Sequence, residues 1–264
     1  MNCWHAIAKC LALVALVTAG GWLSVHSTVA NDADTKKPAP ASDTAKLVPL
    51  SKTHEIWLDP TNKLLLVDGA VCLREGFLEM FACPKGTKEH ESIVAVNCDA
   101  MTVHAGLLAL GAKIGGPVKF DPKFVPASGT AVEIFVTWTD KAGKPQKVRA
   151  QEWIRNSKTK KEMTYQWVFA GSGFFLDEDS GKRYYNADAG DLVCVSNFPT
   201  ATLDLPIESS QANADLQFEA FSERIPPKGT KVRLIFQPKL TAAKSDGKPA
   251  TPEKKDESAK PAAK

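Results

Sequence analysis

Residues 91–117 read ESIVAVNCDAMTVHAGLLALGAKIGGP, and this stretch decides the fold class. Residues 91–96 form a short apolar run of the length and composition typical of a buried strand. Residues 100–112 instead repeat their apolar side chains at helical spacing. Since the other ordered segments of the chain are strand-like, we expect one principal helix within a β-rich domain.

The expected helix has a recognisable start, apolar face and end. Val103, Leu107 and Leu110 lie on one face of a helix, because they are spaced by about one turn. Asp99 precedes this face and is a favoured N-cap residue, since its carboxylate can accept hydrogen bonds from the first backbone N–H groups. The sequence Gly-Gly-Pro at residues 115–117 follows, and we expect it to stop the helix.

Short strand-like segments fill most of the chain on either side of this helix. Asp68-Gly69 lies between two of them and predicts a tight hairpin turn, because this dipeptide tolerates positive φ angles. Residues 140–144 contain glycine and predict a further hairpin, and residues 177–182 predict a polar turn. The chain is therefore expected to be mainly β or α+β, with mixed or antiparallel sheets. The expected strands are residues 55–58, 63–67, 70–73, 91–96, 132–139, 145–154, 167–170, 174–176, 183–185, 192–195, 202–205, 216–221 and 231–236.

The beginning of the chain has the features of a secretory signal peptide. Residues 10–25 carry no charge and are mostly apolar, and Thr28-Val29-Ala30 fits the small-residue pattern of a cleavage site. The apolar run is short for a membrane span, so a retained membrane anchor is the alternative. We expect residues 1–30 to be removed and the protein to be secreted or periplasmic, with no membrane span after cleavage.

Two further segments have compositions that do not support folding. Residues 31–46 and residues 240–264 are rich in Lys, Pro, Ala, Asp, Ser and Thr and contain few large apolar side chains. Such segments cannot bury enough surface to offset the entropy of ordering. We therefore expect a disordered linker, a globular domain over residues 47–239 and a disordered tail. These flanking segments suit contacts with components of the cell envelope.

Four of the six cysteines remain after the predicted cleavage. An exported protein meets an oxidising compartment, so disulfides are permitted. Cys72 and Cys83 flank a stretch that can return as a hairpin, and a bridge between them is the candidate disulfide. The alternative is that these cysteines, together with Cys98 and Cys194, are buried as small apolar residues with free thiols.

Residues 82–94, ACPKGTKEHESIV, gather residue types that can carry chemistry just before a strand expected to be central. This segment supplies Lys, His, Glu and Ser side chains within five positions, and a further histidine lies on the helix that follows. We take these side chains as the candidate ligand-binding site. Its members are Lys88, His90, Glu91, Ser92 and His104.

Two motifs in this part of the chain, KEHESIV at residues 88–94 and LLALGAKIG at residues 107–115, together resemble the YdjY-like domain of exported bacterial proteins. The sequences VFAGSGF at residues 168–174 and DLVCVSNF at residues 191–198 resemble planctomycete-type members of that family. The resemblance covers most of residues 50–238. Most family members have no established activity, so the resemblance implies a fold and little chemistry. The family has also been associated with an iron–sulfur ferredoxin, but this chain has no C-x-x-C motif and no cluster is expected.

A divalent metal site is the sharper hypothesis, because His90, Glu91 and His104 have the side chains that zinc and similar ions prefer. Neighbouring residues on a regular strand point to opposite faces, so His90 and Glu91 can share an ion only at a bulge or in a loop. The alternative is that both histidines are structural, with His90 hydrogen-bonded across the sheet and His104 bordering the apolar face of the helix.

The charge composition reduces the range of possible functions. The net charge of +3 is small, and we expect no nucleic-acid partner because such proteins usually carry a dense basic surface. The favoured interpretation is an exported, non-enzymatic binding or structural domain at the cell envelope. The alternative is a metal- or thiol-dependent enzyme that uses His90, Glu91 and His104, with Cys83 as the thiol.

Overall fold

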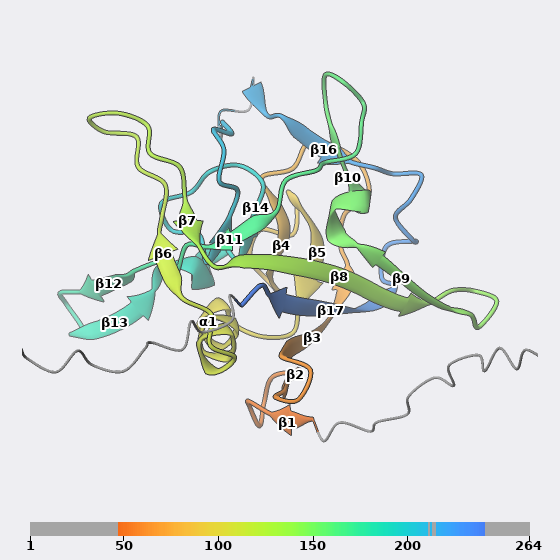
Figure 1. Ribbon diagram of the computed structural model, residues 1–264, viewed down its shortest axis with the longest axis horizontal. Coiled ribbons are helices and arrows are strands. Elements are labelled where there is room, and N and C mark those ends of the chain that lie inside the picture. The colour runs from red at the N-terminus through yellow and green to blue at the C-terminus, as the bar shows by residue number, and fades with distance from the viewer. Residues whose placement is uncertain (1–46, 211, 213–214, 241–264) are drawn as a thin grey trace, which may run out of the picture. The chain divides into compact units, whose positions relative to one another are not determined.

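The computed structural model describes residues 47–210, 212 and 215–240 (Figure 1). The predicted signal peptide at residues 1–30, the predicted linker at residues 31–46 and residues 241–264 of the predicted tail lie outside the described residues. The boundaries of the globular domain therefore stay predictions.

The described residues form many short strands and one α-helix, in agreement with the expectation of a mainly β or α+β domain. The elements in chain order are β1 (Val48–Pro49), β2 (Ile56–Asp59), β3 (Leu64–Val71), β4 (Met80–Pro84), β5 (Ser92–Val96), α1 (Ala100–Ala109), β6 (Ile114–Gly116), β7 (Ser128–Gly129), β8 (Ala131–Thr139), β9 (Pro145–Arg149), the 3₁₀ helix η1 (Ala150–Trp153), β10 (Ile154–Asn156), β11 (Trp167–Phe169), β12 (Phe174–Asp177), β13 (Lys182–Tyr185), the 3₁₀ helix η2 (Asn186–Ala189), β14 (Val193–Cys194), β15 (Leu203–Asp204), β16 (Phe218–Ala220) and β17 (Lys231–Pro238).

The main sheet closes on itself. Its strands pair in the order β3, β17, β8, β11, β15, β14, β4 and β5, and β5 then pairs with β3 to complete the circuit. Strands β1 and β2 extend the sheet beside β3, and β9 pairs with β8. Most pairs are antiparallel, whereas β4–β5 and β14–β15 are parallel. The sheet is therefore mixed, as the sequence predicted.

Every second side chain along the longest strands points into the interior of this circuit and fills it. Val132, Ile134 and Val136 of β8 are fully buried, and their intervening neighbours face outward. Leu234 and Phe236 of β17 are fully buried in the same core. Burial of each such side chain contributes about 2 kcal/mol, so the closed sheet is held mainly by its apolar interior.

The predicted hairpin turn at Asp68-Gly69 is wrong. Both residues lie inside β3, which runs unbroken and pairs first with β2 and then with β5 along the same edge. Glycine is required here because a Cβ on Gly69 would lie 2.4 Å from the carbonyl oxygen of Ala95 on β5. The turn lies earlier in the chain, between β2 and β3, where Asp59 accepts a hydrogen bond from the backbone N–H of Asn62 at 2.9 Å.

The helix α1 confirms the predicted start and apolar face. Asp99 is its N-cap, and its carboxylate accepts a hydrogen bond from the backbone N–H of Thr102 at 2.5 Å. The predicted stop at residues 115–117 is wrong, because Gly111 ends the helix with φ of +94°. The N–H of Ala112 then donates to the carbonyl of Leu107 at 3.0 Å, which is the Schellman arrangement. No helix among the described residues is long and apolar enough to span a membrane.

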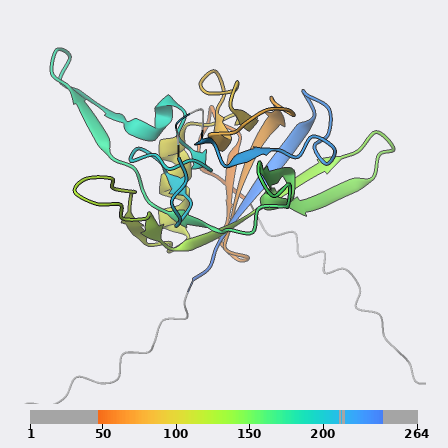
Figure 2. The same ribbon diagram turned by 90° about the horizontal axis from the view of Figure 1, so that it is seen from above.

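The predicted hairpin at residues 140–144 and the predicted turn at residues 177–182 are confirmed, and both belong to hairpins that extend from the closed sheet (Figure 2). Residues 140–144 connect β8 to β9, and Asp140 caps the turn by accepting from the N–H groups of residues 142 and 144. Residues 178–181 connect β12 to β13. Phe175, at 59 % exposed, and Leu176, at 53 % exposed, leave this second hairpin with an apolar surface.

Candidate functional site

The predicted ligand-binding residues begin in the connection from β4 to β5, which spans residues 85–91. These two strands are parallel neighbours, so the connection has to cross from the end of one strand to the start of the other. Gly86 has φ of +83°, and its N–H donates to the Glu89 carboxylate at 2.8 Å. Thr87 Oγ1 donates to the carbonyl of Pro84 at 2.6 Å. The loop is therefore held by its own side chains.

Lys88 is the centre of a charged cluster. Its Nζ lies 3.1 Å from Asp191 Oδ1, 3.6 Å from Glu91 Oε1 and 3.8 Å from Glu79 Oε2. The same Nζ lies 4.4 Å from the centre of the Phe198 ring, close enough for a cation–π interaction. We name these five residues the Lys88 cluster. It joins the start of β4, the β4–β5 loop and the segment around β14.

The electrostatics of the Lys88 cluster favour a charged lysine. Burial acts to lower the pKa of Lys88, but Asp191, Glu91 and Glu79 outweigh this effect and raise it. Burial raises the pKa of Glu79, and the neighbouring Glu91 raises it further. Thr200 Oγ1 donates a hydrogen bond to Asp191, which holds that carboxylate in place. One ammonium group thus lies among three carboxyl groups, so acidic groups outnumber basic ones in the cluster.

Ser92 and His90 flank Glu91 of the Lys88 cluster in the chain but have different surroundings. Ser92 is fully buried, and its Oγ donates to the carbonyl of Lys88 at 2.7 Å. His90 has 78 % of its side chain exposed, with Nε2 3.8 Å from Glu91 Oε1. Ser92 therefore fixes the loop from inside, whereas His90 belongs to the surface.

His104 lies on α1 and is held by other groups. Its Nδ1 lies 2.7 Å from the Tyr185 hydroxyl, and its ring meets the edge of Phe169 with ring centres 4.9 Å apart. Burial lowers the pKa of His104, so the neutral imidazole is favoured. Tyr185 in turn lies within hydrogen-bond distance of the Gly171 carbonyl and the Thr202 hydroxyl. This arrangement matches the structural histidine that the sequence left as an alternative.

The structure does not assemble the predicted metal ligands His90, Glu91 and His104. Glu91 Oε1 lies 3.6 Å from the Lys88 ammonium and 3.8 Å from His90 Nε2, whereas His104 faces Tyr185. Among the described residues, no group of three or more His, Cys, Asp or Glu side chains is arranged to hold a metal ion.

The candidate disulfide between Cys72 and Cys83 is not formed, and both residues have free, buried thiols. Strand β5 separates them, since Cys72 hydrogen-bonds to Ile93 on one side and Cys83 pairs with Ala95 on the other. Two strand spacings are roughly 9.6 Å, beyond the Cα separation that a disulfide spans. Burial raises the pKa of Cys72 to about 12 and raises that of Cys83. Neither thiol is therefore activated as a nucleophile.

A cleft of about 990 Å³ lies on the outer face of the main sheet, over strands β3, β17 and β8. Figure 1 shows these three strands running side by side. The floor of the cleft consists of residues that lie opposite one another on neighbouring strands. Asp68 pairs with Arg233, Arg233 with Thr137, and Thr137 with Lys147. Small side chains at Ala70 and Ala95 lie beside this row. We call this hollow the outer-face cleft.

The three carboxylates of the outer-face cleft already have partners. Asp68 receives two bonds from Arg233, from Nε at 2.5 Å and from Nη2 at 2.8 Å. Glu55 accepts from the side chain of Asn97, and Glu89 accepts from the N–H of Gly86. The acidic side of the lining is therefore engaged within the protein.

The lysines of the outer-face cleft differ in this respect. Lys85, Lys147, Lys228 and Lys231 line it, and none of them forms an ion pair with another described residue. Lys147 packs its ammonium 4.4 Å above the Phe135 ring, which leaves the charge facing the cleft side of the sheet. The cleft thus offers positive charge that the protein itself does not neutralise.

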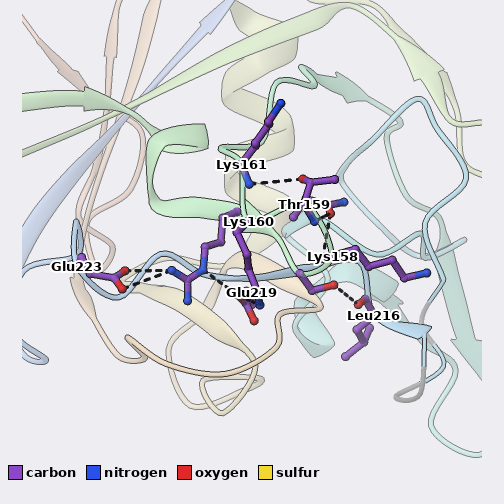
Figure 3. A network of polar contacts seen from close by, with 10 residues as sticks. Lys158, Thr159, Lys160, Lys161, Leu216, Glu219 and Glu223 are labelled. Atoms are coloured by element: carbon purple, nitrogen blue, oxygen red, sulfur yellow. Dashed lines mark hydrogen bonds and ion pairs between the residues drawn. The ribbon is translucent and has the colours of Figure 1, made fainter.

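The lysine and arginine side chains around β10 are arranged differently from the lysines of the outer-face cleft. Arg155 on β10 donates to Glu219 at 2.7 Å and lies 3.2 Å from Glu223, and Lys160 donates to Glu219 at 2.8 Å (Figure 3). Arg155 and Lys160 thus each have an acidic partner, whereas Lys158 and Lys161, also drawn in Figure 3, form no ion pair with another described residue. The ion pairs of Arg155 and Lys160 tie β10 to β16, so we regard this network as structural.

Sequence reasoning found part of these sites. It named Lys88 and Glu91, which are close in the chain, but missed Glu79 and Asp191, which reach the same place from other strands. It also missed the outer-face cleft. The only local sign of the cleft is the alternation of cationic and apolar residues in KVRLIF at residues 231–236, and strand register is needed to read it.

Comparison with known proteins places this chain in a family. The family model named YdjY domain matches residues 56–237, from the start of β2 to within β17. The match includes the Lys88 cluster and almost all of the outer-face cleft. No curated protein and no solved structure matches the chain. Because the matched region is well over half of the chain, and the resemblance in its sequence motifs agrees, the chain belongs to the YdjY domain family.

Proposed function

We propose that this protein is an exported, non-enzymatic binding domain that acts at the cell envelope and holds its ligand in the outer-face cleft. Export is supported by the apolar, uncharged segment and small-residue cleavage pattern at residues 1–30. Binding is supported by one observation above all. A cleft of about 990 Å³ is lined by four lysines that have no acidic partner among the described residues.

The cleft is suited to binding because its lining stands on paired strands. β3, β17 and β8 each have partners on both sides, so their outward side chains are fixed relative to one another. A site built on such strands loses little conformational entropy when a ligand arrives. Lys85 and Glu89 come from the β4–β5 loop, which the Lys88 cluster holds from its other side.

The Lys88 cluster supports this role and is less suited to catalysis. Its side chains form ion pairs with one another, and Lys88, Glu91 and Asp191 are each no more than 26 % exposed. A lysine with a raised pKa is a poor base and a poor nucleophile. We assign to the cluster the task of fixing the β4–β5 loop.

Binding is tested by isothermal titration of the purified chain with four probes: an acidic oligosaccharide, an acidic peptide, a neutral oligosaccharide and inorganic phosphate. Ala70→Trp places an indole on the floor of the cleft and is expected to abolish binding of any probe that the wild type holds. Glu178→Trp, in the turn between β12 and β13, is the matched control and is expected to bind as the wild type does. Binding that survives Ala70→Trp, or no binding of any probe, overturns the proposed site.

Export is tested separately with the full chain produced in a two-membrane bacterial host. The expected result is a periplasmic or external protein whose mass corresponds to loss of residues 1–30. A chain that stays inside the cell with its full mass contradicts this part of the proposal, whatever the titrations show. The metal-enzyme alternative predicts stoichiometric metal in the purified protein, and elemental analysis decides it.

A further inference from the structure

We infer that the ligand of the outer-face cleft is an acidic oligosaccharide, a chain that carries both carboxylates and hydroxyl groups. This inference rests on the proposed function, since it names the chemical class that the cleft would hold. It follows from three features of the lining: the placement of the unpaired cations, the kind of polar groups between them, and the strand pairing of the floor.

The unpaired cations lie at both ends of the cleft floor. Lys85 follows β4 and Lys228 precedes β17, whereas Lys147 stands on β9 at the far side of β8. Lys231 lies between these positions, opposite Ala70 on β3. The floor crosses from β5 to β9 over four strand spacings, roughly 19 Å. Charge is therefore offered at several separated points, which suits an extended ligand with more than one carboxylate better than a single small anion.

Polar groups of mixed character occupy the floor between the lysines. Asp68 and Glu55 are hydrogen-bond acceptors, Arg233 is a donor, and the Thr137 hydroxyl, which donates to the Arg233 carbonyl at 3.3 Å, can accept. A ligand with only carboxylates would be repelled by Asp68, Glu55 and Glu89. Each of these carboxylates has further lone pairs besides those engaged within the protein, so the hydroxyl groups of a ligand can donate to them. A ligand with hydroxyl groups as well as carboxylates therefore suits the lining.

Strand pairing argues against an acidic peptide. Peptides gain much of their affinity for a sheet by adding a strand at an open edge, through main-chain hydrogen bonds. The floor of the outer-face cleft consists of β3, β17 and β8, whose main-chain groups already pair with strands on both sides. Recognition in this cleft therefore depends on side chains, and a peptide would leave its own main-chain groups without partners there.

The test compares three six-unit probes in the same buffer: hexa-galacturonate, hexaglutamate and maltohexaose. Hexa-galacturonate is expected to bind most tightly and to weaken as salt is raised, since exposed charges are screened. Lys147→Gln and Lys231→Gln are each expected to raise its Kd about fivefold, the change expected for an exposed charge contact of about 1 kcal/mol. Lys182→Gln, on β13 and outside the cleft, is the control and is expected to leave the Kd unchanged.

The outcomes separate this inference from the function on which it rests. If hexaglutamate binds as tightly as hexa-galacturonate, and Ala70→Trp abolishes both, the cleft is a binding site but the ligand class is wrong. If maltohexaose binds as well as the acidic sugar, the role of the lysines is wrong. If hexa-galacturonate binds with equal affinity to the wild type and Ala70→Trp, both the inference and the proposed site fail. Circular dichroism and urea unfolding of each variant show that the fold is retained.

Discussion

The carbonyl oxygen of Ala95 on β5 lies 2.4 Å from the point where a Cβ of Gly69 on β3 would stand. This close approach is what allows β5 to pair with the second half of β3 after β2 has paired with its first half. The circuit of strands closes at this pair. Gly69 is therefore required by the approach of another strand and not by a turn.

Gly69→Ala is expected to lower the free energy of unfolding by about 2 kcal/mol or more, because the added methyl group forces β3 and β5 apart in a packed sheet. Urea unfolding measures the change. Gly173→Ala is the matched control, since the nearest atom to its added Cβ is Asn186 Nδ2 at 3.5 Å, an ordinary contact. Equal stability of the two variants would show that the strands can separate at no cost.

A buried carboxyl group predicts how stability depends on pH. Asp204 on β15 has no solvent exposure, and burial raises its pKa to about 7. The unfolded chain has the ordinary value near 4, so between these values the folded state binds the extra proton. Stability therefore falls as pH rises from about 4 to about 7, and the loss is complete above pH 7.

Asp204→Asn is expected to flatten this dependence and to raise the free energy of unfolding at pH 8 by roughly 2–4 kcal/mol. The amide keeps an oxygen that can accept from the N–H of Leu205, which donates to Asp204 at 2.8 Å. Unfolding in urea at a series of pH values checks this. Asp179→Asn, in the exposed turn after β12, is the control for loss of one negative charge. A variant with the wild-type pH profile would show that Asp204 is ionised when folded.

Removal of Lys88 is expected to destabilise the protein. Lys88→Met leaves Glu79, Glu91 and Asp191 without their cation, and breaking a partly buried ion pair in this way costs about 2 kcal/mol. The deficit is expected to shrink at low pH, where the carboxyl groups take up protons. Lys182→Met, on exposed β13, is expected to have little effect.

A double-variant cycle gives the sharper measurement for this cluster. Asp191→Asn in the Lys88→Met background removes one of the uncompensated charges and is expected to restore part of the lost stability. If the two changes are simply additive in urea unfolding, Lys88 and Asp191 do not interact in solution.

The start of α1 predicts a further stability change. Asp99→Ala removes the carboxylate that accepts from the N–H of Thr102, and an N-cap of this type is worth about 1 kcal/mol. Asp99→Ser supplies another capping oxygen and is expected to recover most of the loss. Chemical denaturation of the three proteins decides between a cap and a mere surface charge, because the serine variant lacks the charge.

The four described cysteines are expected to be unreactive in the folded protein. Cys72 is 6 % exposed and Cys98 5 %, whereas Cys83 and Cys194 have no exposure. In a chain carrying Cys3→Ser and Cys10→Ser, a thiol reagent is expected to detect no groups before unfolding and four in denaturant without reductant. Fewer than four groups after unfolding would reveal a disulfide.

Local features of this chain could be predicted from its sequence, and distant ones could not. The helix follows from side-chain spacing and from the cap at Asp99, both of which act within a few residues. The turn at residues 140–144 is equally local. Asp68-Gly69 was misread because its glycine is required by β5, which lies far along the chain. Propensity alone does not distinguish a turn from a close approach.

The candidate sites could likewise be predicted from the sequence only where their residues are close in the chain. Lys88 and Glu91 are three positions apart, so their meeting could be anticipated, but Asp191 reaches Lys88 only after β14 has paired with β4. The outer-face cleft depends on the register between β17 and its neighbours, which places Lys231 opposite Ala70. Register between distant strands is set by the packing of the whole core, so it cannot be predicted from a single sequence.

The place of β17 in the sheet also determines when the domain can fold. This strand is the last regular element of the described chain, yet it lies between β3 and β8 and hydrogen-bonds to both. A growing polypeptide therefore cannot complete its central sheet until residue 238 has emerged from the ribosome. Long-range pairing of this kind slows folding. For a protein exported as we propose, that delay leaves the new chain unfolded during the interval in which a secretion channel must thread it.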